Sequence, residues 1–415
     1  DYGGHILYPH ANYPAFGDLI DGLVDAWDES PPIRGVFYDG MLIPYPVQQN
    51  IHRLSSRKLA SAFIGLGTAK MLGRVRPRRR EGTDRGLAHH LRSRFGRGLS
   101  RLVMEPMNHK MWATAPAAMA SAWTSHRSGS KVANVADVSL AKVARSIFTR
   151  RDHLGWGPTT FVRYPRGGGT GALWKNFAKR LPTENIRTGV RVIGIDAARH
   201  RLHLSSGAII PYRRLISTMP LDELMRMVGM EQPVGLPRLQ YASASFVGLG
   251  IVGARPAWLD GVHSFHLPDP DIACWRLSFP ASLSGSNVPG DNAWSILCEI
   301  SHNDGTAYDL LHAAAAIERS LRSLGIIPQG NMVVSQWRET LKHGYPVPFL
   351  GRDALLDDVH KRLAALDIFS RGRFGGWKYE VSNMDHTFMQ GAEVMDFVVN
   401  GTAETTYMAA AAVNA

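Results

Sequence analysis

The spacing of apolar residues changes from helical to strand-like after about residue 150, and that change restricts the folds the chain can adopt. Between residues 51 and 150 the apolar residues recur mostly at helical spacing. Strand patterns follow, first VRVIGIDAARHRLHLSSGAIIPYRRLISTMP (190–220), which alternates like a hairpin, and then shorter runs at 245–253 and 293–300. A glycine-rich turn and a helix are predicted near the end, after residue 370. This order indicates an α/β or α+β protein of more than one domain, with the chain passing between domains.

Length and cysteine content exclude several classes of protein. The 415 residues are enough for two or three domains with buried cores. No apolar run reaches the roughly 18 residues that a membrane helix needs. Two cysteines, Cys274 and Cys298, are too few for a disulfide framework or a thiolate-rich metal site. We therefore expect a cytoplasmic protein with no membrane partner, in which both cysteines are small buried hydrophobes.

The net charge of +12 favours an anionic partner, such as nucleic acid, a membrane surface or a phosphorylated metabolite. Much of the excess lies in RVRPRRR (74–80) and RGLAHHLRSRFGRGLSR (85–101). These segments fit a solvated loop and a helix with a basic outer face. Aromatic residues are not interleaved with the arginines, so we expect no nucleic-acid partner.

The stretch WGPTTFVRYPRGGGTGALW (156–174) holds a glycine cluster just before a helical pattern. GGGTG lacks the lysine of a phosphate-binding Walker loop, and the chain has no zinc-ligand spacing and no GxSxG motif. Glycine lets a backbone approach another group closely. We expect a tight turn beside a cofactor; a turn that serves only packing is the alternative.

Four residues are suited to holding a diphosphate, because arginine bonds phosphate in a fork and tyrosine donates a hydroxyl. They are Arg127, Arg276, Tyr345 and Tyr379. Arg276 lies among apolar and aromatic residues, where an unpaired charge is costly unless an anion meets it. Each residue alone also fits a surface position or an internal ion pair. Together they favour an anion site only modestly.

Longer motifs support a more specific interpretation. They are DYGGHILYPHANYPAF, DGMLIPYPVQQNI, MEPMNHKMWA, AMASAW, WGPTTFVRYPRGGGTGALW, RRLISTMP, HGYPVP and SRGRFGGWKYEVSNMDHTFMQGAEVMD. With these stretches the chain resembles the eukaryotic-type UDP-galactopyranose mutase family from end to end. The resemblance implies an α/β fold, in which a Rossmann-type FAD-binding domain (GR2-like) is interwoven with a helical domain and an antiparallel sheet domain.

The same resemblance implies how the chain divides. The FAD-binding domain would be discontinuous and comprise residues 1–15, 151–220 and 366–415. The helical substrate domain would comprise 51–150. Residues 16–50 and 221–365 would form the antiparallel sheet domain and connecting segments.

The resemblance also implies an activity. Members of the family are isomerases that interconvert the pyranose and furanose forms of a UDP-sugar, so that galactofuranose is made from galactopyranose. The N5 atom of reduced FAD is thought to attack the anomeric carbon and form a sugar adduct while UDP leaves and later returns. The expected partners are a nucleotide-diphosphate sugar and an electron source, either NAD(P)H or a reductase; a homo-oligomer is possible, and no metal is expected.

Site residues carry over motif by motif. Catalytic roles are implied for Arg127, Arg276 and His5. Substrate binding is implied for Tyr45, Gln48, Asn108, Trp112, Thr159, His266, Tyr345 and Tyr379, with Tyr45 and Gln48 as the uridine pair. Cofactor binding is implied for Gly3, Gly4, His5, Val192, Arg373, Asn383 and Met384.

The sequence departs from the family pattern in two ways. No GxGxxG fingerprint precedes the GGH loop, and we expect the missing strand–turn–helix unit to precede Asp1 in a longer chain. Positions expected to contact sugar or base are also substituted: they are Pro32, Val47, Thr159, Ser264 and His266. The substitutions indicate that the chemistry is retained on a different nucleotide-sugar or a modified galactose.

Two other functions fit the same residues. One is an FAD-dependent oxidoreductase of the amine-oxidase type, to which a diphosphate clamp would be of no use. The other is a non-catalytic protein that binds nucleotide-sugars.

Overall fold

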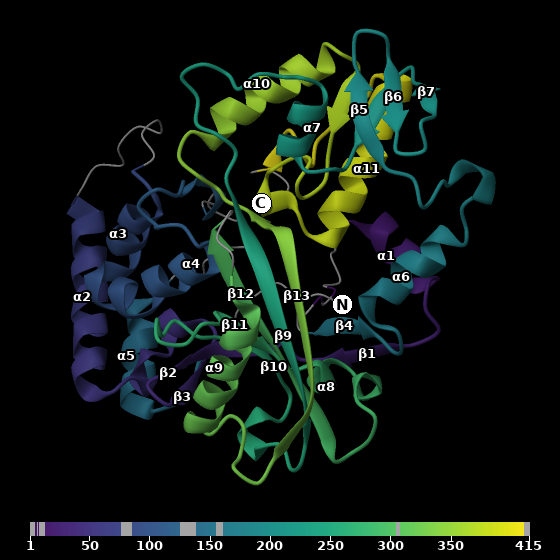
Figure 1. The fold of residues 1–415 in the computed structure, drawn as a ribbon. Helices are drawn as coiled ribbons and strands as arrows, with labels where there is room; N and C mark the ends of the chain where they lie inside the picture. Colours follow the sequence, from purple (N-terminus) through teal and green to yellow (C-terminus); the bar gives the residue numbers. More distant parts are fainter. Residues whose placement is uncertain are drawn as a thin grey trace.

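The computed structural model describes residues 5, 7, 13–75, 85–124, 138–154, 161–303 and 308–410 (Figure 1). Its helices are α1 (Pro14–Asp21), α2 (Ser56–Val75), α3 (Leu87–Leu99), α4 (Glu105–Trp112), α5 (Leu140–Thr149), α6 (Gly169–Ala178), α7 (Leu221–Met227), α8 (Pro280–Leu283), α9 (Leu310–Ser323), α10 (Arg352–Ala364) and α11 (Met384–Asn400). Its strands are β1 (Trp27–Ser30), β2 (Ile33–Tyr38), β3 (Met41–Pro44), β4 (Val162–Pro165), β5 (Val192–Asp196), β6 (Arg201–Leu204), β7 (Ile209–Pro211), β8 (Leu215–Ser217), β9 (Tyr241–Val252), β10 (Val262–His266), β11 (Arg276–Ser278), β12 (Ala293–Asn303), β13 (Met332–Pro346) and β14 (Ile368–Ser370). Within these ranges, no helix has both the length and the apolar character that crossing a membrane requires.

A seven-stranded sheet with the order β13-β9-β12-β11-β10-β2-β3 is the largest element. Strands β9, β12 and β13 are 12, 11 and 15 residues long and reach across the molecule in Figure 1. Neighbours in the sheet are antiparallel except β10 and β2, which pair in parallel. The sheet predicted from 16–50 and 221–365 therefore includes one parallel pairing. It arises because β2 comes from the N-terminal part of the chain and not from a hairpin with β10.

Helix α9 covers one face of this sheet. Its residues Ala313, Ala314 and Ile317 belong to the same buried apolar cluster as the inward side chains of β9 and β12. Alanine at the contact lets the helix axis lie close to the strands. Cys274 and Cys298 are free thiols in the same cluster, which confirms that they serve as small buried hydrophobes.

Helices α2 to α5 lie in the region from 51 to 150 where the apolar spacing predicted helices. Helices α2 and α3 approach so closely that side chains cannot fit between them. A Cβ atom on Gly96 would lie 2.1 Å from the backbone of Gly65, and one on Gly98 would lie 2.1 Å from the carbonyl oxygen of Ser61. The glycines in this basic stretch therefore set the helix crossing.

A second group of elements surrounds the parallel pair β8 and β14. Strands β5, β6 and β7 form an antiparallel three-stranded sheet beside it, at the top of Figure 1 with α7, α10 and α11. The segment 190–220 thus holds a three-stranded meander where its alternation suggested a hairpin, and β8 is the apolar strand predicted before Pro220. The extra turn between β6 and β7 (SSGA, 205–208) returns the chain, and β8 then leaves to pair with β14.

The glycine cluster forms the turn before α6. Gly167, Gly168 and Gly169 have φ angles of 81°, 72° and 62°, a left-handed conformation that favours glycine. A Cβ atom on Gly167 would meet nothing within 4 Å, and one on Gly168 would meet only the Cβ atom of Ala172. At these two positions the backbone conformation itself favours glycine. That the turn lies beside a cofactor stays a prediction.

Candidate active site

The site is built on one cross-strand row of the large sheet. Arg276, the first residue of β11, lies opposite Glu299 of β12 on one side and opposite His266 of β10 on the other. Residues directly opposite each other on paired strands project from the same face. Arginine, glutamate and histidine therefore stand side by side over three adjacent strands.

Glu299 joins Arg276 to Tyr345. The Nε atom of Arg276 donates to Oε2 of Glu299 at 2.9 Å, and Nη2 of Arg276 donates to the same oxygen. The hydroxyl of Tyr345 donates to the other oxygen, Oε1. The Glu299 side chain is 2% exposed and that of Arg276 is 23% exposed, so the carboxylate lies beneath the guanidinium.

The protonation states follow from this arrangement. Burial alone would lower the pKa of Arg276, but the charge of Glu299 raises it above its usual range, so the guanidinium stays charged. Burial and the Glu299 carboxylate raise the pKa of Tyr345 well above its ordinary value, so the phenol keeps its proton. Burial, with the charges of Arg276 and Arg34, lowers the pKa of His266 to about 3. The imidazole is therefore neutral at physiological pH.

Aromatic rings from four segments surround this row. Trp112 at the end of α4 is fully buried and meets Tyr379 edge-on at 4.7 Å between ring centroids and Tyr345 at 5.9 Å. Trp275 lies under the guanidinium of Arg276, whose Cζ atom is 4.7 Å from the ring centroid. The indole Nε1 atoms of Trp112 and Trp275 are buried and have no hydrogen-bond partner among the described residues.

A cofactor-sized pocket adjoins the aromatic group. It has a volume of about 440 Å³ and is lined by Ile216, Thr218, Pro220, His343, Arg371, Gly372, Arg373, Phe374, Thr387 and Gly391. Most of the lining follows the carboxyl ends of the parallel strands β8 and β14, the edge where open α/β sheets bind cofactors. The guanidinium of Arg373 lies 5.9 Å from the ring centroid of Tyr345 and 5.6 Å from that of Tyr379. Arg373 therefore connects the pocket to the Arg276 row.

The turn that carries Arg373 is held by the C-terminal segment 401–410. Arg371 donates from Nε to Oε2 of Glu404 at 2.5 Å and from Nη2 to Oε1. Tyr407 packs under Arg371, and its hydroxyl donates to the Gly376 carbonyl at 3.2 Å. Because these groups are buried, the position of Arg373 depends on the C-terminal segment.

Lys110 joins the helical region to the loop before Arg276. Its Nζ atom donates to three backbone carbonyls, those of Leu267 (2.7 Å), Asp269 (2.6 Å) and Ile272 (2.7 Å). Burial lowers the pKa of Lys110 to about 8, while three carbonyl acceptors favour the ammonium form. Lys110 lies between Asn108 and Trp112 on α4, so it fixes the predicted sugar-side residues relative to β11.

The predicted uridine pair lies elsewhere in the same sheet region. Tyr45 and Gln48 flank the end of β3, where the Tyr45–Pro46 peptide is cis. Burial raises the pKa of Tyr45, and the charge of Arg34 acts on the phenol in the opposite sense. The charge of Arg34 also helps to lower the pKa of His266, so Arg34 acts on both side chains. The family pattern placed an arginine before this segment, where the chain has Pro32; Arg34 follows two residues later on β2.

The remaining predicted residues occupy separate places. Val192 begins β5, Asn383 is the exposed N-cap of α11, and Met384 begins that helix and packs with the cluster around α1. Asn108 donates to the Met104 carbonyl at 2.9 Å, and His5 is exposed. Arg127, Thr159, Gly3 and Gly4 lie outside the described residues. Roles for all of these stay predictions.

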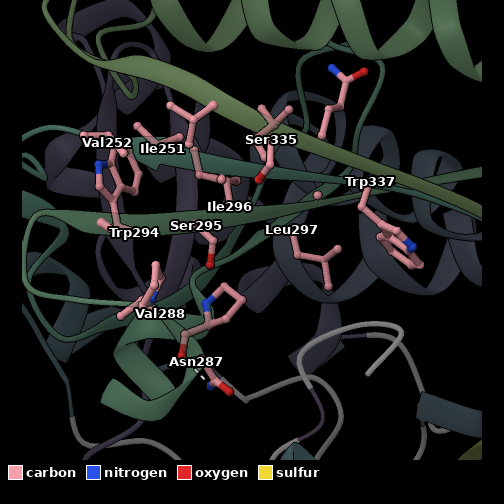
Figure 2. A pocket seen from close by; sticks show the side chains of 18 residues that line it. Ile251, Val252, Asn287, Val288, Trp294, Ser295, Ile296, Leu297, Ser335 and Trp337 are labelled. Atoms are coloured by element: carbon pink, nitrogen blue, oxygen red, sulfur yellow. Dashed lines mark hydrogen bonds between the residues drawn. The ribbon is translucent and has the colours of Figure 1, made fainter.

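A larger pocket, of about 720 Å³, lies further along β9, β12 and β13 (Figure 2). Trp294, Trp337, Ile251 and Val288 contribute to its lining, which contains no charged side chain. A diphosphate needs cationic partners. This pocket is therefore a poor match for a nucleotide, and the Arg276 row is a better one.

Glu299 is the site residue that the sequence patterns did not reveal. A signal was present, because AWSILCEI (293–300) contains a single charge in an otherwise apolar strand. A carboxylate buried in such a strand needs a cationic partner. Finding the partner required the register between β11 and β12.

Comparison with known proteins gives the site its context. No protein-family model matches the sequence. A crystal structure of reduced UDP-galactopyranose mutase superposes with a TM-score of 0.89 at 31% identity, covering 100% of this chain and 86% of that one. A protein assigned as a protoporphyrinogen oxidase from Exiguobacterium sp. 255-15 (TM-score 0.62, 14% identity, 96% of this chain and 90% of that one) shares the fold only. So does an oxidoreductase from Methanosarcina mazei (0.54, 12%, 94% and 87%).

These likenesses confirm the predicted fold class, a mixed α/β protein with a Rossmann-type FAD-binding fold interwoven with helices and a large sheet. The whole chain takes part in the match to the mutase structure, and the shared identity is more than twice that with either oxidoreductase. The chain belongs to the UDP-galactopyranose mutase family.

Proposed function

We propose that this protein is a flavin-dependent isomerase that interconverts the pyranose and furanose forms of a UDP-sugar, either UDP-galactopyranose or a variant of it. The observation that carries the proposal is the convergence of Arg276, Tyr345, Tyr379 and Arg373. These residues come from β11, β13 and the C-terminal turn. Arg373 lines the smaller pocket and lies 5.9 Å and 5.6 Å from the ring centroids of Tyr345 and Tyr379, and Glu299 joins Tyr345 to Arg276. Two guanidinium groups set among buried and half-buried aromatic rings match a diphosphate.

The residues around the smaller pocket fit a flavin. Arg373 offers a cation at the border with the Arg276 row, and Phe374 offers an apolar wall. The lining follows two parallel strands, where dinucleotide cofactors bind. Bound there in its reduced form, FAD would supply the nucleophile for the anomeric carbon. We infer that Arg371–Phe374 would hold it, and that NAD(P)H or a reductase would keep it reduced.

The chain's own residues would hold the leaving group. Arg276 has N–H groups that no described residue occupies, and it can bond the diphosphate through them. The ring of Tyr379 lies beside Trp112, with 4.7 Å between the centroids, and we infer that Tyr379 lines the same space. Buried rings on several sides exclude water, so that UDP stays in place to be attacked again by the sugar.

His266 and Ser264 would contact the sugar. Both lie on β10, two residues apart, so they project from the same face as Arg276. A neutral imidazole can donate one hydrogen bond and accept another from hydroxyl groups. We infer that this polar pair, where the family pattern has aromatic residues, selects a sugar that differs from unmodified galactose.

The test incubates the reduced, FAD-supplied protein with UDP-galactopyranose and related UDP-sugars and separates the products by chromatography. We expect a furanose from at least one of them, its loss in Arg276→Ala, and no product with the oxidised protein. Oxygen consumption coupled to substrate loss would instead indicate an oxidoreductase. Tight UDP-sugar binding without turnover in either redox state would indicate a binding protein.

A further inference from the structure

We propose that Glu299 limits the strength with which this site holds a nucleoside diphosphate. By neutralising Arg276 from beneath, the carboxylate weakens the attraction for the anion and allows UDP and product to leave. The inference rests on the proposed function, because it assigns the diphosphate to Arg276. It makes Glu299 a positioning and charge-balancing residue that does not itself touch the substrate.

The hydrogen bonds show how Glu299 both positions Arg276 and balances its charge. Nε and Nη2 of Arg276 both bond Oε2 of Glu299, and Tyr345 occupies Oε1. The guanidinium is thereby held by one edge. Its Nη1 atom has no hydrogen-bond partner in the part of the chain that the structure describes, and it remains available to an anion.

The charges show why the carboxylate must lower affinity. Arg276 and Glu299 together carry no net charge, so an arriving diphosphate meets a guanidinium whose field is largely cancelled. Glu299 is buried, so water screens its repulsion for the anion poorly. We expect this repulsion to weaken diphosphate binding by about tenfold.

Glutamine can replace Glu299 without losing a partner. Both N–H groups of Arg276 point to a single oxygen, which the amide oxygen can supply. The amide nitrogen can then donate to the Tyr345 hydroxyl oxygen, so the contact between the two side chains is kept, although the Tyr345 O–H gives up its acceptor. Glu299→Gln thus removes the charge and leaves the geometry.

A matched control exists on the same face of the sheet. Glu299 and Glu339 both lie opposite Phe246, one on each neighbouring strand, so Glu339 is about 10 Å away, at two strand spacings. Its side chain bonds the Thr340 backbone and no arginine. Glu339→Gln removes the same charge without touching Arg276.

The experiment measures UDP binding to the wild-type protein and both variants by titration calorimetry at several salt concentrations. Glu299→Gln should bind UDP about tenfold more tightly, with a steeper salt dependence and a lower kcat, because the product leaves slowly. Glu339→Gln should change each quantity less than twofold. A residue with a merely structural role would give weaker binding on substitution.

The outcomes separate this inference from the proposed function. Unchanged or weaker UDP binding by Glu299→Gln overturns the inference alone, provided that the wild type binds UDP. Equal tightening in Glu339→Gln also overturns it, because the effect would then be one of overall charge. An unfolded Glu299→Gln protein would contradict the hydrogen-bond exchange described above. Failure of the wild type to bind UDP at all overturns the proposed function, and this inference with it.

Discussion

Replacing Glu404 by glutamine should destabilise the C-terminal segment by about 3 kcal/mol, at the low end of the cost of removing one partner from a buried ion pair. The Arg371 and Glu404 side chains are 5% and 2% exposed. Each oxygen of Glu404 accepts an N–H from Arg371. An amide has only one acceptor, so its NH₂ group would face a guanidinium N–H.

The same substitution at Glu299 should cost only about 1 kcal/mol. The amide oxygen can still accept both N–H groups of Arg276, so the loss of stability is limited to about the worth of one neutral hydrogen bond. The two variants remove the same charge from the same type of pair. They differ in whether one or both oxygens accept from arginine. A difference in stability therefore reflects the acceptor geometry together with the greater exposure of Arg276, 23% against 5% for Arg371.

Hydrogen exchange detected by mass spectrometry suits this comparison, because it reports local opening of residues 401–410 as well as global unfolding. A loss of 3 kcal/mol corresponds to exchange about 100-fold faster. The double replacement Arg371→Met with Glu404→Leu should recover most of the loss, since an apolar pair of similar volume often substitutes for a buried ion pair. Equal costs for the two glutamine variants, or no recovery in the double variant, would refute the reasoning.

Four further substitutions test individual features of the structure. Because burial lowers the pKa of His266 to about 3, against 6.5 in an unfolded chain, the unfolded state takes up a proton first as the pH falls. The wild type should lose about 1.4 kcal/mol of stability per pH unit below 6.5, relative to His266→Gln. Urea unfolding at pH 7 and pH 5 measures this, and an equal change of stability in the two proteins would contradict it. Gly167→Ala should cost about 1 kcal/mol for its φ of 81° alone, whereas Gly96→Ala should cost about 3 kcal/mol or more, because backbone atoms lie 2.1 Å from the new Cβ. Lys110→Met should cost about 3 kcal/mol of stability, because it leaves three carbonyls unpaired. It should also raise KM for the sugar. A loss of stability with unchanged KM would mean that Lys110 does not position the site.

The sequence predicted the local elements well and the pairings between them poorly. Helical spacing between 51 and 150 corresponds to α2–α5, and the apolar strands near 245 and 293 correspond to β9 and β12. The parallel pairing of β10 with β2 could not be predicted, because it joins distant segments and depends on register. The roles of Gly96 and Gly98 were hidden for the same reason, since the backbone they contact belongs to another helix.

Part of the site could be predicted and part could not. Arg276, Tyr345 and Tyr379 stood out as donors suited to a diphosphate, and the structure brings them together. Glu299 and Glu404 did not stand out, because acidic residues are common and only the folded chain reveals which are buried beside arginine. Arg371 was hidden likewise, since a buried ion pair leaves no periodic pattern in the sequence.

Arg352 and Arg371 are the buried arginines of the described residues, and both pair with carboxylates; their hydrogen bonds can be compared with those of the partly exposed Arg276. Arg352 bonds Asp353 and Glu380 through all three of its nitrogens. Arg371 uses all three on Glu404 and the Ser370 carbonyl. Arg276 uses only Nε and Nη2, and its side chain is 23% exposed, against 2% and 5% for the other two. An arginine whose three nitrogens all bond inside the protein gains little from an anion, whereas one held by a single edge can bind an anion without first breaking a bond. By this criterion Arg276 is the one of the three that is available to a diphosphate, and its free Nη1 atom is the group that a bound nucleotide should occupy.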